Sequence, residues 1–199
     1  MKILKNKSGP QLFMYSVIAV TLITSIICFT LYYRGINTNK KILLTGIVTF
    51  TIMYHFWVRI IMGNVSKLFK KRINYNHWWF NERKFEKQLY KILRVKTWKD
   101  KALTYNPESF SMKNHSLEEI ANTMAKSEID HWINEAISLS TLLFIIPWGL
   151  FWAFVISTIV AMIFDSQFII IQRYNRPRIV KLLKRQAATQ EHTTINNLI

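Results

Sequence analysis

The chain has 199 residues, of which 50% are hydrophobic, 14% aromatic and 19% charged. This composition excludes a disordered tail and a coiled-coil rod, and the low numbers of Gly, Pro and Cys exclude collagen-like proteins, disulfide frameworks and zinc fingers. The 27 Lys and Arg residues against 11 Asp and Glu residues give a net charge of +16, so we expect a negative partner: nucleic acid, an anionic lipid surface or a phosphate-bearing ligand.

The first apolar run, residues 12–33, contains no charged residue. At about 1.5 Å per residue, its 22 residues can cross a hydrocarbon core of about 30 Å. Lys2, Lys5 and Lys7 precede the run, as in a signal peptide, but the run is longer than the apolar part of a signal peptide and no small-x-small cleavage site follows. We therefore expect residues 1–40 to form an uncleaved anchor span with a short external loop.

A second apolar run, residues 42–62, predicts a second span. Its charged residue, Arg59, lies with His55 near the C-terminal end of the run, where a long cationic side chain can extend to the membrane interface. We expect the Arg59 guanidinium to lie at that interface.

The last apolar run, residues 132–171, contains Glu135 and Asp165 as its only charged residues. A single helix of this length would be about 60 Å long, twice the thickness of the hydrocarbon core. The Pro-Trp-Gly sequence at residues 147–149 favours a tight turn, because proline removes a helical hydrogen bond and glycine adopts turn conformations. The sequence therefore predicts an all-α membrane protein with four transmembrane helices: two N-terminal spans and a C-terminal helical hairpin.

The distribution of Lys and Arg predicts the orientation in the membrane. Three lie before the first span, three in residues 34–41, fourteen in residues 63–130, and six from Arg173 onward. Because cytoplasmic loops carry the excess of positive charge, we expect a multi-pass protein of the cell membrane with both termini in the cytoplasm. A basic cytoplasmic face would bind anionic membrane lipids, which accounts for the net charge without nucleic acid. We expect residues 41–185 to form one membrane domain, followed by a flexible polar tail at 186–199.

Residues 63–130 are expected to form a cytoplasmic helical segment that contains an amphipathic helix. Its apolar residues recur at helical spacing: Phe85, Leu89, Ile92 and Leu93. Three tryptophans flank this helix: Trp78, Trp79 and Trp98. Since Trp rings prefer the level of the lipid headgroups, we expect the helix to lie on the membrane surface.

A capping box at Ser116 and Glu119 predicts the start of a further helix, which runs into the third span. On this helix Glu128, His131 and Glu135 are spaced i, i+3 and i+7 and therefore share one face. The Glu128 carboxylate can orient the His131 imidazole as a general base. One alternative is a weak metal half-site, but the second Glu-x-x-His that a di-metal centre needs is missing, so we expect no metal. The other is an interfacial His-Trp pair that only caps the span.

The segment after the fourth span reads Gln-Arg-Tyr-Asn-Arg-Pro-Arg over residues 172–178. Membrane anchoring explains three arginines, but their mixture with Gln, Tyr and Asn around a proline suits bidentate recognition of phosphate or carboxylate groups. The helix axes of an antiparallel hairpin lie about 8–10 Å apart, so His131 and Arg173 at its two cytoplasmic ends are expected to be neighbours. The two clusters therefore form one predicted site.

Three motifs carry a family resemblance. They are Val-Lys-Thr-Trp-Lys-Asp at residues 95–100, Ser-Glu followed two residues later by His-Trp at residues 127–132, and Ile-Ile-Ile-Gln-Arg-Tyr-Asn-Arg-Pro-Arg at residues 169–178. Through these motifs, residues 42–185 resemble the glycosyl-4,4′-diaponeurosporenoate acyltransferase family, small membrane enzymes that esterify the sugar of a glycosylated carotenoid acid to yield staphyloxanthin-type pigments. The first 40 residues have no counterpart in a shorter member of that family, and Ser127 stands where the family pattern has Ala.

The resemblance implies a membrane acyltransferase. Its donor would be a fatty acyl thioester such as acyl-CoA, used as a co-substrate without a bound cofactor, and its acceptor a glycolipid or glycosylated carotenoid. From the chemistry of acyl transfer we expect His131, oriented by Glu128, to remove the hydroxyl proton. The expected substrate-binding residues are Trp98, Lys99, Trp132, Gln172, Tyr174 and, holding the donor, Arg173, Asn175, Arg176 and Arg178. Residue 136 is Ala, so a His-x4-Asp pair is missing, as is a Gly-x-Ser-x-Gly elbow, which favours direct transfer without an acyl-enzyme.

Two other functions stay open at this point. A non-enzymatic membrane adaptor would bind anionic lipid or a partner enzyme through its basic cytoplasmic face. A polar-headgroup methyltransferase is the third hypothesis. An enzyme is expected to contain a cleft that joins His131 to the arginine cluster and opens sideways to lipid, whereas an adaptor needs no enclosed polar pocket.

The orientation can be tested by labelling single thiols in intact cells. A thiol introduced at Ser111 is expected to be protected from an impermeant reagent, and one introduced at Thr38 is expected to react, because the charge distribution places them on opposite sides. The parental chain, whose cysteine is Cys28, sets the background. Equal labelling of the two thiols would contradict the assignment.

Overall fold

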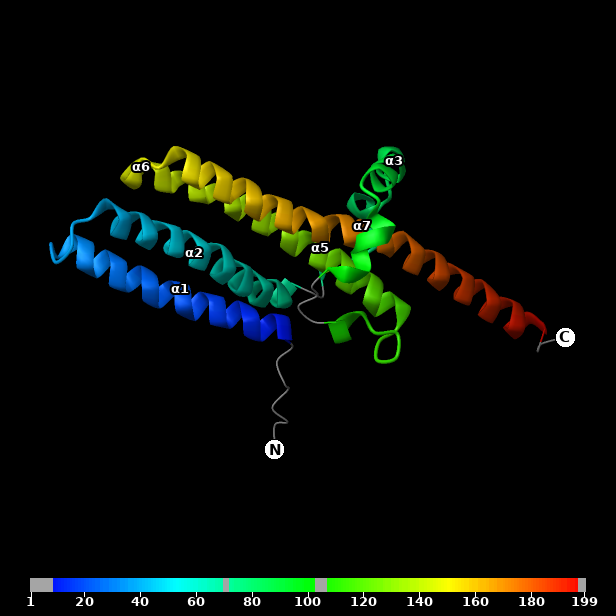
Figure 1. The fold of residues 1–199 in the computed structure, drawn as a ribbon. Coiled ribbons are helices and arrows are strands. Elements are labelled where there is room, and N and C mark those ends of the chain that lie inside the picture. The colour runs from blue at the N-terminus through cyan, green and yellow to red at the C-terminus, as the bar shows by residue number, and fades with distance from the viewer. Residues whose placement is uncertain (1–8, 70–71, 103–106, 197–199) are drawn as a thin grey trace, which may run out of the picture. The chain divides into compact units, whose positions relative to one another are not determined.

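The computed structural model describes residues 9–69, 72–102 and 107–196 (Figure 1). Within these ranges the chain forms helices and connecting turns and contains no strand. The α-helices are α1 Gly9–Tyr33, α2 Lys40–Phe69, α3 Lys84–Ile92, α4 Val95–Trp98, α5 Leu117–Leu139, α6 Ile145–Trp148 and α7 Phe151–Asn196. Short 3₁₀-helices are η2 Trp78–Phe80, η3 Lys99–Lys101, η4 Pro107–Phe110 and η5 Ser140–Phe144.

Four helical stretches in the described part of the chain are long and apolar enough to cross a membrane: Gly9–Tyr33, Lys40–Phe69, Leu117–Trp148 and Phe151–Gln190. The last two are joined at the predicted hairpin, where Gly149 adopts a φ of 67° that favours glycine. The prediction of an all-α chain with four helices of membrane-spanning length is confirmed. The side of the membrane on which each loop lies stays a prediction.

The chain divides into two compact units. Unit 1 contains Met1–Val65 and Ile133–Asp165, and unit 2 contains Ser66–Trp132 and Ser166–Ile199. Helices α2, α5 and α7 contribute residues to both units. The boundaries predicted from the sequence, at residues 40 and 185, follow changes in composition rather than contacts, and they stay predictions.

Unit 2 contains the start of α5 and the C-terminal part of α7. The Ser116 N–H donates to the Glu119 carboxylate at 2.9 Å, and the Glu119 N–H donates to the Ser116 hydroxyl at 3.2 Å, so the predicted capping box is confirmed. Helix α7 continues through Pro177 and is helical as far as Asn196. The motif at residues 172–178 therefore lies on a helix, and the helix extends into the predicted polar tail.

Aromatic side chains pack the helices of unit 1 next to the hairpin turn. The Trp148 ring stacks on Phe29 at 5.7 Å between centroids and meets Phe50 edge-on at 5.6 Å. Gly46 lets α1 and α2 approach closely, because a Cβ at this position would lie 3.0 Å from a ring carbon of Phe29. Figure 1 shows these two helices side by side in blue and cyan. The contacts hold α1 and α2 against the hairpin within unit 1.

A buried ion pair joins α2 to α7 inside unit 1. The Arg59 guanidinium pairs with the fully buried carboxylate of Asp165 and donates to the carbonyl of His55 at 2.6 Å. Asn134 donates to the other oxygen of Asp165 at 3.4 Å. Helix α2 continues ten residues beyond Arg59 to Phe69, and the position of Arg59 relative to the membrane interface stays a prediction.

Removal of the acidic partner should destabilise unit 1. Asp165→Leu leaves the Arg59 guanidinium buried without an anion, which typically costs about 3–5 kcal/mol, so the midpoint of thermal unfolding in detergent should fall by many degrees. The double variant Arg59→Met/Asp165→Leu removes both charges and should recover most of that midpoint. A double variant that unfolds below Asp165→Leu would contradict this account.

Candidate functional site

Four charged side chains meet in the interior of unit 2. Glu86 comes from α3, Glu128 from α5, and both Arg173 and Arg176 from α7. Each arginine places Nη1 2.6 Å from a different oxygen of Glu128, and Arg173 Nη2 lies 2.6 Å from Glu86 Oε1. Glu128 is 0% exposed, Arg176 2% and Glu86 4%. Two acids balance two guanidiniums, as burial of charge requires, and we call these four side chains the ion-pair network.

Helical spacing explains why both arginines reach one carboxylate. Arg173 and Arg176 are three residues apart on α7 and therefore point to the same side of that helix. A carboxylate has two acceptor oxygens, so Glu128 serves both guanidiniums at once. Pro177 follows directly and cannot donate an N–H, but it lies inside α7 rather than ending it.

Arg173 uses all five of its N–H donors. Nε and one N–H of Nη2 bond to Glu86 at 2.9 and 2.6 Å, and the other N–H of Nη2 bonds to the carbonyl of Asn81 at 3.2 Å. Nη1 donates to Glu128 at 2.6 Å and to the carbonyl of Trp79 at 3.3 Å. In this arrangement no guanidinium donor is left for a substrate. The predicted role of Arg173 in holding the acyl donor stays a prediction.

Arg176 connects the same carboxylate to the segment before α3. Nη2 donates to the carbonyl of Phe80 at 2.9 Å, and the guanidinium lies over the Phe80 ring at 4.7 Å from its centroid. The segment itself starts at His77, whose ring nitrogen accepts from the N–H of Trp79 at 3.3 Å. Together Arg173 and Arg176 therefore bind three consecutive carbonyls, those of Trp79, Phe80 and Asn81.

Helix α3 turns a polar pair toward the interior of unit 2. Glu86 and Tyr90, four residues apart, are buried, whereas Phe85 is 61% and Ile92 69% exposed. The Tyr90 hydroxyl donates to Glu86 Oε2 at 2.8 Å. Burial, together with this hydrogen bond to a carboxylate, raises the pKa of Tyr90, so its hydroxyl stays a neutral donor. The apolar side of the helix faces outward, and its predicted place on the membrane surface stays a prediction.

A cavity of about 380 Å³ borders the ion-pair network, and we call it the apolar cavity. Helices α3, α5 and α7 supply most of its lining residues, which are Trp79, Arg83, Phe85, Glu86, Leu89, Tyr90, Trp132, Ser166, Ile169, Ile170 and Arg173. Apolar and aromatic side chains dominate, while Glu86, Tyr90 and Arg173 form a polar part of the wall. Such a lining suits an apolar chain that carries a polar group at one point.

A second cavity of about 320 Å³ borders Arg176, and we call it the polar cavity. Its lining residues are Tyr75, Asn76, Phe80, Asn81, Glu82, Arg176, Pro177, Val180, Lys181 and Lys184. Three cationic groups and one carboxylate are among them. Because the Arg176 charge is already balanced by Glu128, Lys181 and Lys184 give this cavity its positive character.

In the structure, Glu128 and His131, which the sequence predicted to pair, each contact other residues. Both oxygens of Glu128 accept hydrogen bonds from guanidiniums, and the His131 ring stacks on Phe168 at 4.7 Å between centroids. On α5, Glu128 contacts Arg173, and the predicted proximity of His131 to Arg173 stays a prediction. Trp132 lines the apolar cavity. The catalytic role of His131 stays a prediction.

The other predicted residues are spread around the network. Gln172 donates to the Ser127 hydroxyl at 3.3 Å, and Arg178 lies 3.6 Å from the ring centroid of Tyr174, whose carbonyl it also contacts. Asn175 is half-buried on α7. Trp98 and Lys99 make local contacts, with the carbonyl of Leu93 at 2.8 Å and with Asp100 at 2.6 Å, and neither belongs to the lining of the two cavities.

Sequence reasoning missed Glu86, Tyr90 and the carbonyls of residues 79–81. The spacing of Glu86 and Tyr90 could have indicated a buried polar pair, because an acid and a tyrosine four residues apart share one face of a helix. The carbonyls leave no signal in the sequence. No group of three or more His, Cys, Asp or Glu side chains that could hold a metal ion occurs within residues 9–69, 72–102 and 107–196.

Comparison with known proteins shows that the site lies in the part of the chain that matches a known protein family. The family model described as glycosyl-4,4′-diaponeurosporenoate acyltransferase matches residues 76–185, more than half of the chain. The matched range contains the whole ion-pair network and all residues that line the apolar cavity. No curated protein and no solved structure matches the chain.

Two arginines that the sequence treats alike should differ in their effect on stability. Arg176→Ala removes a partner of the buried Glu128 and should cost about 3–5 kcal/mol, whereas exposed Arg178→Ala should change the free energy of unfolding by about 0.5 kcal/mol or less. The comparison is made by thermal unfolding of both purified variants in the same detergent. Equal losses in the unfolding midpoint would show that Arg176 does not hold the network together.

Proposed function

Because the chain belongs to the glycosyl-4,4′-diaponeurosporenoate acyltransferase family, as its motifs predicted, we propose that it is an integral-membrane acyltransferase. In the proposed reaction, a sugar hydroxyl of a glycosylated carotenoid or related glycolipid attacks the carbonyl carbon of a fatty acyl thioester such as acyl-CoA. The C–S bond breaks as the ester C–O bond forms, and the hydroxyl proton passes to a base and then to the thiolate. This direct transfer uses no acyl-enzyme and no bound cofactor.

The apolar cavity is the observation that carries the proposal. A fatty acyl chain needs an apolar lining, which Leu89, Ile169 and Ile170 supply, and the reaction needs polar groups at one point along it. Its volume of about 380 Å³ lies in the range of about 300–1,000 Å³ that is usual for small-molecule sites. An adaptor that binds lipid headgroups through surface lysines would not need this cavity.

In this proposal the ion-pair network is positioning machinery. Arg173 holds α3 and the segment 79–81 against α7, so the polar wall of the cavity keeps its shape during transfer. Arg83 also lines the cavity, and its guanidinium lies 5.9 Å from the ring centroid of Trp79. Its guanidinium carries five N–H donors, so Arg83 can donate to the oxyanion that forms at the thioester carbonyl.

For the base we propose His131. The carboxylates of Glu86 and Glu128 already accept hydrogen bonds on both oxygens, from guanidiniums and from Tyr90, so neither is placed to take a proton from the acceptor hydroxyl. His131 is not among the lining residues of either cavity, but its ring stacks on Phe168, and the residues that follow these two in the chain, Trp132 and Ile169, line the apolar cavity. From the charge distribution we also propose that residues 63–130 face the cytoplasm.

The proposal is tested by assaying the purified chain in lipid nanodiscs with acyl-CoAs of different length and a glycosylated carotenoid acceptor. Leu89→Trp fills part of the apolar cavity and should lower kcat/KM for a long-chain donor about tenfold, with a smaller loss for a short one, since each methylene excluded loses about 0.8 kcal/mol. Leu182→Trp is the matched control, because Leu182 is 42% exposed and lies outside both cavities.

In the same assay, His131→Ala should lower kcat by about 10²–10⁴-fold while the KM of the donor changes little, because a general base acts on the acceptor. His115→Ala is the control, since His115 lies in the turn before α5 and contacts Glu119, whereas His131 contacts Phe168 of α7. Parental turnover in His131→Ala would make His131 structural. No transfer by the parental chain, together with tight binding to anionic vesicles, would favour the adaptor.

A further inference from the structure

The polar cavity has no part in the acyl transfer described above. Lys181 and Lys184 are three residues apart on α7 and face this cavity together. Among the side chains that the structure describes, no carboxylate forms an ion pair with either lysine. Arg176, by contrast, is engaged by Glu128 and by the carbonyl of Phe80. The positive charge of the two lysines is therefore available to a ligand.

We propose that the polar cavity binds a phosphate group of the acyl donor, an inference that rests on the proposed acyltransferase function. Lys181 and Lys184 supply two ammonium groups, and the side-chain amides of Asn76 and Asn81 line the same cavity and can donate as well. A phosphate group carries about one to two negative charges on its terminal oxygens, which suits two ammonium groups better than the single charge of a carboxylate does, and these oxygens can also accept from the amides. Glu82 is the opposing charge in this cavity.

The two cavities have a common wall. Trp79 lines the apolar cavity, and the next residues, Phe80 and Asn81, line the polar one. The carbonyls of these three residues accept hydrogen bonds from Arg173 or Arg176, so the wall is held in place from α7. A donor that carries an acyl chain and a phosphate in one molecule can place one on each side of this wall. Phosphopantetheine thioesters and phospholipids both have this chemistry.

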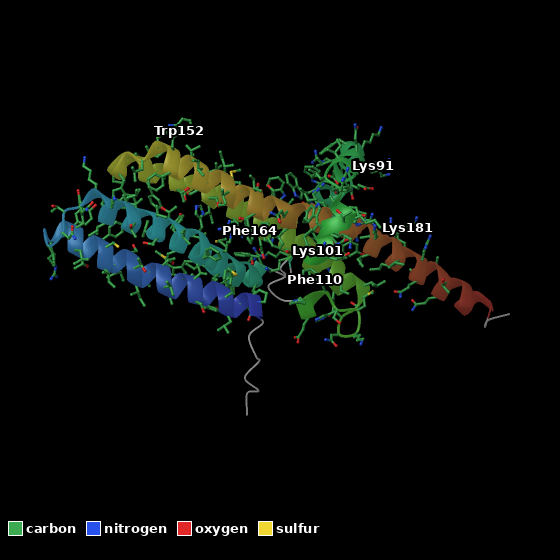
Figure 2. The ribbon with its side chains drawn as sticks, in the orientation of Figure 1. Lys91, Lys101, Phe110, Trp152, Phe164 and Lys181 are labelled. Carbon is green, nitrogen blue, oxygen red and sulfur yellow. The ribbon has the colours of Figure 1, made fainter. Side chains whose placement is uncertain are left out.

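The experiment measures binding of coenzyme A, which carries phosphates but no acyl chain, to the full chain in nanodiscs of neutral phosphatidylcholine. Lys181→Gln/Lys184→Gln should weaken binding about tenfold, since each exposed ion pair contributes up to about 1 kcal/mol. Lys91→Gln/Lys101→Gln removes the same charge from positions outside both cavities and should bind like the parental chain; Lys91, Lys101 and Lys181 are labelled in Figure 2. Glu82→Gln should strengthen binding, because it removes the opposing charge.

Two further ligands identify the source of the phosphate. Pantetheine has no phosphate and should bind weakly and equally to all variants. If phosphatidylglycerol added to the nanodisc displaces coenzyme A from the parental chain, and Lys181→Gln/Lys184→Gln loses that competition, the phosphate belongs to a phospholipid donor. If it does not compete, the phosphate belongs to a phosphopantetheine thioester. Equal weakening by both double-lysine variants, or pantetheine that binds as tightly as coenzyme A, would overturn the proposal.

Failure of this inference is distinct from failure of the proposed function. If the parental chain transfers acyl groups and Lys181→Gln/Lys184→Gln shows an unchanged KM for the donor, the phosphate site is wrong and the acyltransferase stands. If coenzyme A binding depends on both lysines but no acyl group is transferred to any acceptor, the cavity binds phosphate and its assignment to a donor falls.

Discussion

A carboxylate buried away from water needs positive partners to stay charged, and the organisation of unit 2 depends on how Glu128 meets this requirement. Its two oxygens bind Arg173 and Arg176, one turn apart on α7. The remaining donors of these arginines bind Glu86 on α3 and the carbonyls of residues 79–81. One anion on α5 is thus joined through Arg173 to α3 and to residues 79 and 81, and through Arg176 to residue 80.

The same interaction shapes both cavities. Arg173 lines the apolar cavity and Arg176 the polar one, and a single carboxylate holds both guanidiniums. The segment between the cavities is fixed through main-chain carbonyls, which keep their hydrogen-bonding capacity whatever side chains the segment carries. The exposed side chains of Trp79 and Asn81 can therefore vary while the wall stays in place, whereas the buried Phe80 ring packs against Arg176.

The sequence predicted those features that depend on neighbouring residues. Apolar runs gave the four long helices, the Pro-Trp-Gly sequence gave the hairpin turn, and the Ser116–Glu119 spacing gave the start of α5. It failed where partners lie far apart in the chain. Glu86 and Arg173 are 87 residues apart, and no local pattern distinguishes a buried glutamate from an exposed one. The arginine motif was recognised as unusual, but the number of donors left for a substrate depends on contacts that a sequence does not contain.

The balance of charge inside the ion-pair network has a consequence for the surface. Two of the 11 acidic residues, Glu86 and Glu128, form buried ion pairs with the two guanidiniums of the network. These four charges cancel, so the net charge of +16 comes from the other side chains, many of which are exposed lysines. Mobile ions screen exposed charges over about 8 Å at physiological ionic strength but hardly reach buried ones. Added salt should therefore screen the charge of the basic surface while the interior framework persists. The salt concentration therefore distinguishes the buried charges, which hold unit 2 together, from the exposed charges of the surface.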